Sequence, residues 1–142
     1  MTLSLVTGGA GFVGRHLTAA LIARGEEVRV LDLVESDIAE TLVGSIEDAA
    51  IARRACAGAD AVFHLAGNAQ LWAKDETLFD RVNRGGTETM LAAASAAGVR
   101  RFIHCSSLTT LVGRSTPIGA SSADETNLLS PDEMLGAYPK SK

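Results

Sequence analysis

A glycine-rich turn close to the start of the chain constrains its fold more than any other feature. Residues 7–14 read TGGAGFVG and follow a short apolar segment. The glycines match a G-x-G-x-x-G pattern that begins at Gly9, or a T-G-x-x-G-x-x-G pattern built on Gly8, Gly11 and Gly14. Both patterns make a tight turn, let the backbone approach a phosphate and pack the next helix close to the preceding strand. The turn therefore predicts a dinucleotide site with the pyrophosphate at a helix N-terminus, the alternative being an ordinary tight turn.

The periodicity of apolar residues predicts strands that alternate with helices. Strands are expected at 3–7, 27–33, 42–43, 61–65 and 101–106. Helices are expected after the turn as far as Gly25, from 45 to 58, from 75 to 97 and from about residue 138, with a loop over 109–133. We expect Ser45 to cap the second helix, with Asp48 as its partner in a capping box. The alternation predicts an α/β fold, a doubly wound parallel sheet in the order 3-2-1-4-5, as one domain over residues 1–142.

Composition and charge limit the possible functions. Of the 142 residues, 46% are hydrophobic and 21% are charged, which is ordinary for a soluble domain. The net charge of -4 argues against a nucleic-acid partner, and no apolar run reaches the ~20 residues that a membrane span needs. The first residues lack the basic leader of a signal peptide. Cys56 and Cys105 are far apart without metal-ligand spacing, so we expect two buried thiols, no metal site and a cytoplasmic location.

An acidic residue at the end of the second strand indicates which cofactor the site prefers. Asp32 lies near the ~20-residue offset at which such folds place a carboxylate that binds the adenosine ribose. A carboxylate there repels a 2′-phosphate, and the next residue, Leu33, offers that phosphate no positive charge. We therefore predict NAD, although Arg15 and Arg29 leave NADP possible. The alternative for Asp32 is a solvated strand end.

The last residues place a phenol and an ammonium one helical turn apart. Tyr138 and Lys142 are four positions apart, so a helix brings them to one face. A phenol can carry a proton in catalysis, and a nearby ammonium favours its charged form. Outside the context of the other motifs, the pair would be an ordinary exposed helix start.

Taken in order, these motifs resemble the extended short-chain dehydrogenase/reductase superfamily, also called the NAD-dependent epimerase/dehydratase family. The resemblance is carried by residues 7–14, 32, 44–48, 62–66, 83–87, 106–107 and 138–142. Residues 71–75 and 132–138 further resemble the dihydroflavonol-4-reductase-like branch, which includes the hopanoid-associated sugar epimerases. The resemblance implies a Rossmann fold that ends before the substrate lobe.

The resemblance also implies the catalytic roles. Tyr138 would be the general acid or base, and Lys142 would assist it and hold the nicotinamide ribose. Ser107 is the best match to the residue that orients the substrate oxygen, with Ser106 next and Thr109 as an outside candidate. The implied function is NAD(P)-dependent hydride transfer at a hydroxyl or carbonyl of a sugar nucleotide or another small metabolite, by a reductase, epimerase or dehydratase.

The cofactor site follows from the same alignment of motifs. The residues expected to bind the cofactor are Gly8, Gly11, Phe12, Val13, Gly14, Asp32, Leu33, Ser45, Ile46, Leu65, Ala66, Gly67, Tyr138 and Lys142. His64 and Asn83 are expected to have structural hydrogen bonds, and the Gly85-Gly86 pair to permit close helix packing.

Three features depart from the family pattern. Ser45 stands where the family commonly has an aspartate that contacts the adenine amino group, and Gly67 stands where a second alanine is common. Family members also continue well past the lysine, so we expect the 142-residue chain to be inactive alone and the full-length parent to form a homodimer. The alternatives are a non-catalytic dinucleotide-binding module and an inactive fragment of such an enzyme.

Overall fold

The computed structural model describes residues 2–70, 72–116, 119, 123–124 and 126–142. Leu71, the first residue of one branch motif, lies outside this range, as does part of the loop expected over 109–133. In chain order the elements are β1 (Leu3–Thr7), α1 (Phe12–Ala23), β2 (Glu27–Asp32), β3 (Glu40–Val43), α2 (Ala49–Cys56), β4 (Ala61–His64), α3 (Thr77–Phe79), the π-helix η1 (Asp80–Gly85), α4 (Gly86–Ala96), β5 (Arg101–His104), the 3₁₀ helices η2 (Leu108–Leu111) and η3 (Pro131–Glu133), and α5 (Ala137–Ser141).

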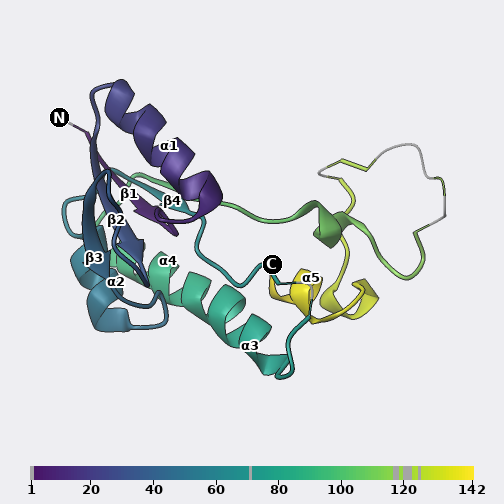
Figure 1. Cartoon of the computed structure of the whole chain (residues 1–142). Coiled ribbons are helices and arrows are strands. Elements are labelled where there is room, and N and C mark those ends of the chain that lie inside the picture. Colours follow the sequence, from purple (N-terminus) through teal and green to yellow (C-terminus); the bar gives the residue numbers. More distant parts are fainter. Residues whose placement is uncertain (1, 71, 117–118, 120–122, 125) are drawn as a thin grey trace.

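The strands form one parallel sheet in the order β3-β2-β1-β4-β5, which confirms the predicted topology. Helix α1 lies on one face, and α2 and α4 lie on the other (Figure 1). The chain reverses its direction of winding between β1 and β4, and such folds bind ligands outside the carboxyl ends of the strands at this point. Most of the residues expected to bind the cofactor lie at or after the ends of β1, β2, β3 and β4 at this edge, while Tyr138 and Lys142 lie on or next to α5.

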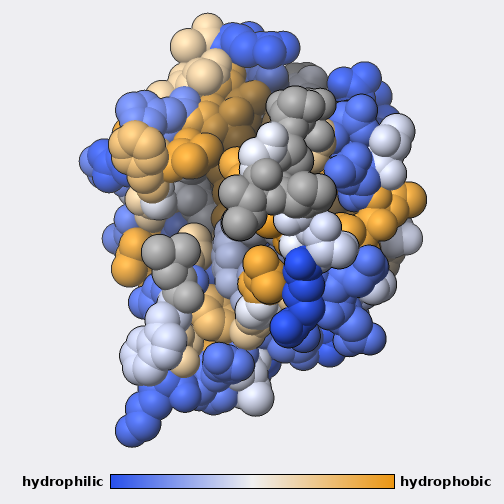
Figure 2. All heavy atoms as spheres, turned by 90° about the vertical axis from the view of Figure 1, so that its right-hand side faces the viewer, coloured by the Kyte–Doolittle hydropathy of each residue, from blue (hydrophilic) through white to orange (hydrophobic). Residues whose placement is uncertain are grey.

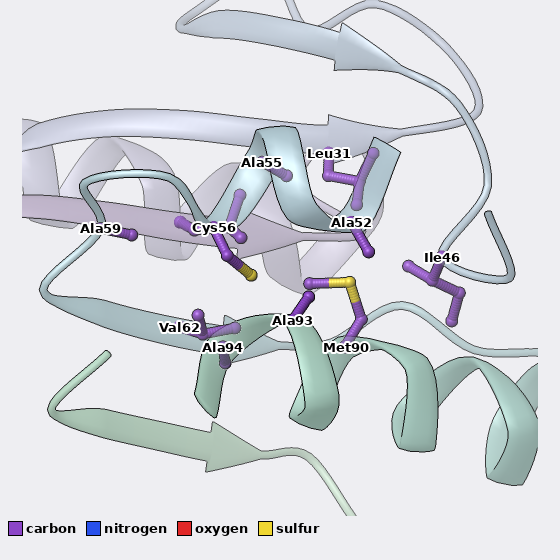
Figure 3. Close-up of a cluster of buried hydrophobic side chains, with 11 residues drawn as sticks. Leu31, Ile46, Ala52, Ala55, Cys56, Ala59, Val62, Met90, Ala93 and Ala94 are labelled. Atoms are coloured by element: carbon purple, nitrogen blue, oxygen red, sulfur yellow. The ribbon is translucent and has the colours of Figure 1, made fainter. Parts of the chain in front are cut away.

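The larger core fills the space between the sheet and the α2–α4 pair. Figure 3 shows Met90 of α4 among small side chains from α2 and from the sheet. Ala52, Ala55 and Ala93 have little or no exposed surface. These small residues let the two helices approach closely, while Leu31 and Val62 supply the apolar face of the sheet.

The cap of α2 differs from the prediction. Asp48, not Ser45, precedes the helix, and Asp48 Oδ1 accepts hydrogen bonds from the backbone N–H groups of Ala50 (2.8 Å) and Ile51 (3.2 Å). The predicted cap at Ser45 is wrong because an aspartate three residues later satisfies the free amide groups of the first turn itself. Ser45 is thereby left in the turn between β3 and the helix.

The long helix predicted over 75–97 is continuous in the backbone but not uniform. It comprises α3, the π-helical turn Asp80–Gly85 and α4, which Figure 1 shows as one coil. In a π-helical turn the backbone hydrogen bonds span five residues instead of four, which changes which side chains face inward. The sequence pattern of apolar residues does not distinguish this turn from ordinary helix, and it contains Asn83.

Two further expectations have mixed outcomes. Cys56 is buried as predicted, but Cys105, which follows the end of β5, is exposed. A Cβ on Gly86 would lie 2.5 Å from Ile46 Cδ1, so close packing explains this glycine. A Cβ on Gly85 would meet only Asp80 O at 3.8 Å, so close packing does not explain that one.

Candidate active site

The glycine-rich turn joins β1 to α1 against the end of β4. Gly8 has φ +72°, and a Cβ there would lie 2.8 Å from the backbone nitrogen of Ala66, so both conformation and space require glycine. The N–H of Gly11 donates to the carbonyl oxygen of Gly8 over 3.1 Å and closes the turn. A Cβ on Gly14 would overlap that same carbonyl oxygen. Gly14 therefore brings the helix onto the strand, while Gly8 and Gly11 line the open side of the turn.

Asp32 at the end of β2 holds the turn from the other side. Its Oδ2 accepts a hydrogen bond from the N–H of Ala10 (3.0 Å), and its Oδ1 accepts one from the N–H of Leu33 (2.7 Å). Oδ1 also accepts a longer bond from the N–H of Val34 (3.4 Å), so the open acceptor position is on Oδ2. The carboxylate is therefore fixed by the protein and can still accept hydrogen bonds from a ligand hydroxyl.

The two arginines that left NADP possible have other partners. Arg15 forms an exposed ion pair with Asp37, with 3.0 Å between Nη2 and Oδ2. Arg29 Nη1 donates to the carbonyl oxygens of Ala55 (2.9 Å) and Ala57 (2.8 Å) and closes the end of α2. Arg29 thus has a structural role, and Arg15 has a competing carboxylate.

A pocket of about 570 Å³ opens at this edge of the sheet. Its lining includes most of the residues predicted to bind the cofactor, namely Gly8, Gly11, Asp32, Leu33, Ser45, Ile46, Leu65, Ala66 and Gly67. Phe12 and Val13 at the start of α1 do not line it and are 83% and 57% exposed. A cavity of about 630 Å³ lies at the opposite, amino-terminal edge, where ionised side chains such as Asp60 and Arg100 pair with each other, and none of the predicted site residues lines it.

Sequence reasoning missed several residues that line the pocket. These are Leu31, Gly44, Glu47, Asn68, Leu78 and Val82. Leu78 and Val82 are four positions apart on the long helix, and this helical spacing of two apolar residues is the signal that could have identified them. The pocket thus has apolar walls, and the two carboxylates of Asp32 and Glu47 lie at its border.

His64 is a buried structural residue, as predicted. Its Nδ1 lies 2.8 Å from Thr7 Oγ1 and its Nε2 lies 2.9 Å from Thr87 Oγ1. Thr7 Oγ1 also accepts from the N–H of Ala66 (3.1 Å). Burial, with added repulsion from His104 and Lys142, lowers the pKa of His64 to about 4. The neutral imidazole therefore links β1 and α4 and orients the pocket loop at Ala66.

Asn83 joins three segments of the site. Its Oδ1 accepts from the N–H of Asn68 (2.7 Å), and its Nδ2 donates to the carbonyl oxygen of Asn68 (3.0 Å) and to Ser141 Oγ (2.9 Å). These bonds confirm that Asn83 pairs with backbone across elements. They also explain the departure at Gly67, because a Cβ there would lie 2.9 Å from Asn83 Oδ1.

The proposed catalytic pair lies on or next to α5. Gly136, with φ +90°, precedes the helix, and the Tyr138 ring packs against Phe79 at 6.1 Å between centroids. Ser141 Oγ donates to the carbonyl oxygen of Tyr138 over 2.7 Å. Lys142 Nζ lies 3.7 Å from the position of a Cβ on Gly67, and burial lowers the pKa of its ammonium group. The lysine therefore lies beside the pocket loop.

The serines after β5 have different surroundings. Ser107 is partly buried, its Oγ lies 2.8 Å from Thr109 Oγ1, and it caps η2 by accepting from the Thr109 N–H. Ser106 Oγ donates to the carbonyl oxygen of Lys142 over 3.5 Å, a long contact. Ser107 is the better fixed of the two. Its assignment as the residue that orients the substrate stays a prediction.

The part of the chain that the structure describes contains no group of three or more His, Cys, Asp or Glu side chains that could hold a metal ion. Within the same residues, no helix is both long enough and apolar enough to cross a membrane.

Residues 4–142 match the family described as the NAD dependent epimerase/dehydratase family. The chain belongs to this family. A 3 beta-hydroxysteroid dehydrogenase/Delta 5-->4-isomerase of Mycobacterium tuberculosis is 39% identical over 133 residues, which are 86% of this chain and 35% of that protein. A putative dihydroflavonol 4-reductase of Synechocystis is 32% identical over 144 residues, which are 96% of this chain and 41% of that protein. This epimerase/dehydratase chain thus spans less than half of the two relatives.

Solved structures agree with this assignment. A short-chain dehydrogenase/reductase superfamily protein from Agrobacterium tumefaciens, with bound NAD, has a TM-score of 0.80 and 35% identity over 99% of this chain and 42% of that chain. UDP-glucose 4-epimerase from Thermus thermophilus, in complex with NAD, has a TM-score of 0.85 and 28% identity over 99% of this chain and 47% of that chain. The predicted family and fold are therefore confirmed.

Proposed function

We propose that this chain binds NAD in the pocket at the carboxyl edge of the sheet and supplies the acid–base residues of a reductase, epimerase or dehydratase. The observation that carries the proposal is the placement of α5. Asn83 connects this helix to the Gly67–Asn68 loop, and that loop lines the pocket. The tyrosine–lysine helix and the cofactor pocket are thereby fixed to one another by hydrogen bonds between buried or half-buried groups.

The residues present fit a dinucleotide. Helix α1 is 12 residues long and its first turn has no side-chain cap at Gly11, so its free N–H groups and dipole favour a pyrophosphate. Asp32 offers acceptor positions for the adenosine ribose. Its negative charge, with Leu33 beside it, disfavours a 2′-phosphate. We therefore propose NAD as the preferred cofactor, in agreement with the NAD bound in the two similar structures.

The residues of this chain would divide the chemistry between them. NAD, when bound, supplies the acceptor or donor of hydride. Tyr138 takes the proton from a substrate hydroxyl at its Oη, or returns it to a carbonyl oxygen. Lys142, whose Nζ lies beside the Gly67 loop, would hold the nicotinamide ribose. Ser107 donates a hydrogen bond to the same substrate oxygen, because a hydroxyl can both donate and accept.

The substrate class follows from this division of roles. The site requires a carbon that carries a hydroxyl or a carbonyl group, as in the hydroxysteroid named for one relative and the sugar nucleotide named for one similar structure. We propose a small metabolite of this kind, a sugar nucleotide being one example.

Calorimetric titration with NAD tests the binding step directly. We expect the unmodified chain to bind NAD. We expect Gly8→Val to abolish binding, because the valine side chain would collide with the backbone of Ala66 and distort the turn that receives the pyrophosphate. Gly98→Val is the matched control: Gly98 also has a positive φ, but no atom lies within 4 Å of its missing Cβ. The proposal would be contradicted if Gly98→Val lost NAD binding while Gly8→Val kept it. It would also be contradicted if the unmodified chain did not bind NAD.

A further inference from the structure

Glu47 is a carboxylate at the border of the pocket that none of the predicted roles uses. It lies in the turn between β3 and α2, and it lines the same pocket as Asp32. Its side chain is 35% exposed, so solvent and protein both contact the carboxylate. Ser45, two residues earlier, carries no charge, and Glu47 is therefore the acidic group on this side of the pocket.

Two donors fix the Glu47 carboxylate from opposite sides. Arg81 Nε donates to Glu47 Oε1 over 2.9 Å, and Ser45 Oγ donates to Glu47 Oε2 over 3.2 Å. The N–H of Glu47 in turn donates to Ser45 Oγ over 3.1 Å. The hydroxyl of Ser45 is thus used as donor and acceptor within the turn. Each carboxylate oxygen keeps a further acceptor position.

Arg81 connects this carboxylate to the opposite wall of the pocket. It lies in the π-helical turn next to Val82, which lines the pocket together with Leu78. Ile46, beside Glu47, and Leu65 complete the apolar lining. An apolar pocket with a fixed acceptor at its border suits a flat heteroaromatic ring that carries an N–H donor on its edge. Figure 2 shows hydrophobic and hydrophilic side chains side by side on the face of the molecule that lies to the right in Figure 1.

We propose that Glu47 accepts a hydrogen bond from the exocyclic amino group of the cofactor's adenine and selects an aminopurine over an oxopurine. This inference rests on the proposed binding of NAD. Asp32 and the glycine turn account for the ribose and the pyrophosphate. Glu47 follows β3, the strand next to β2, so it lies on the side of Asp32 away from the glycine turn of β1. An oxopurine would place a carbonyl oxygen against the carboxylate, which repels it.

The test compares NAD with nicotinamide hypoxanthine dinucleotide, in which an oxo group replaces the adenine amino group. Calorimetric titration of the unmodified chain is expected to give at least about fivefold tighter binding of NAD, the effect of one hydrogen bond to a charged group. In Glu47→Gln, whose amide can donate as well as accept, the preference is expected to disappear or reverse. The side chain keeps its size, so the fold is retained.

Glu88→Gln is the matched control, because Glu88 also pairs with an arginine, Arg84, at 3.0 Å but does not line this pocket. It is expected to keep the preference of the unmodified chain. Equal affinity for both nucleotides in the unmodified chain, or an unchanged preference in Glu47→Gln, would overturn the role of Glu47 and leave NAD binding intact. Failure of both nucleotides to bind would overturn the proposed function together with this inference.

Discussion

Asn83 Nδ2 and Ser141 Oγ lie 2.9 Å apart, and this hydrogen bond joins the π-helical turn to the helix that carries Tyr138. The Ser141 hydroxyl in turn donates a hydrogen bond to the carbonyl oxygen of Tyr138. Both side chains are buried. The position of the helix that carries Tyr138 therefore depends on one amide that also holds Asn68 in the pocket loop.

Replacement of Asn83 by alanine should destabilise the chain. The change removes three hydrogen bonds and leaves the half-buried N–H and carbonyl oxygen of Asn68 without these partners, while Ser141 keeps its bond to Tyr138, so we expect a loss of about 2–3 kcal/mol in the free energy of unfolding. Urea denaturation measures this loss. Asn127→Ala, at an exposed position, is the control and should change stability by less than about 0.5 kcal/mol.

A double-mutant cycle separates the Ser141 contact from the rest. Ser141→Ala alone should cost about 1 kcal/mol. In the Asn83→Ala background it should cost less, because the shared hydrogen bond is already lost. Additive effects of the two changes would show that the two side chains do not stabilise one another.

The buried His64 should make the folded state sensitive to acid. Its pKa is lowered to about 4 by burial, while the unfolded chain has the ordinary value near ~6.5. Between these values the unfolded state binds more protons, so stability is full above pH ~6.5 and falls as the pH drops towards 4. The change should be on the order of 2–3 kcal/mol, and His104, whose pKa is lowered by burial, adds to it with the same sign.

Urea denaturation across this pH range measures the effect. His64→Gln should be less stable at neutral pH but should lose less stability on acidification. His16→Gln, at an exposed position, should retain the pH dependence of the unmodified chain. An equal slope in His64→Gln and the unmodified chain would assign the acid sensitivity to other groups.

Tyr138→Phe should separate chemistry from binding. In a longer protein that contains this chain and turns over substrate, loss of the phenol hydroxyl should lower kcat by ~10²–10⁴-fold and leave NAD affinity nearly unchanged. Lys142→Met should lower both, because Lys142 is assigned a ribose contact as well as its effect on the tyrosine. Single-turnover kinetics and NAD titration measure the two quantities. Near-normal turnover in Tyr138→Phe would exclude the assigned acid–base role.

Asp32→Ala should narrow the preference for NAD over NADP. The change removes the charge that repels a 2′-phosphate. It also leaves the N–H of Ala10 without the carboxylate oxygen that accepts its hydrogen bond. We therefore expect weaker NAD binding and a smaller ratio of the two dissociation constants, both measured by calorimetry. A second variant, Asp37→Ala, removes the ion-pair partner of Arg15. It should tighten NADP binding only slightly, because exposed ion pairs are weak.

The sequence predicts the topology well because each strand is a short apolar run bounded by a turn signal. It also predicts the pocket residues that follow strands, such as Asp32 and Ala66, since topology alone brings strand ends together. The π-helical turn is not predicted, because Asp80–Gly85 has no pattern that differs from ordinary helix. Glu47 is missed for a related reason: its role depends on Arg81, which is 34 residues away in the chain and meets it only in the folded state.

The adjacent Gly85 and Gly86 provide a matched test of packing against the pocket. Alanine at Gly85 meets only ordinary contact, with Asp80 O at 3.8 Å, so the better helix propensity should stabilise the chain by about 0.5–1 kcal/mol. Alanine at Gly86 would place its Cβ 2.5 Å from Ile46 Cδ1 and 2.8 Å from Ile46 Cγ1. Ile46 is buried and must shift, which should cost roughly 1–3 kcal/mol.

The two variants should also differ in cofactor binding. Ile46 lines the pocket, so a shift caused by Gly86→Ala should weaken NAD binding, while Gly85→Ala should leave the dissociation constant unchanged. Thermal denaturation and calorimetric titration of both variants measure the two effects. Destabilisation by Gly85→Ala would mean that the π-helical turn does not tolerate a side chain at its end. Unchanged stability and affinity in Gly86→Ala would mean that Ile46 can move at no cost, and would remove the structural reason for a glycine at this position.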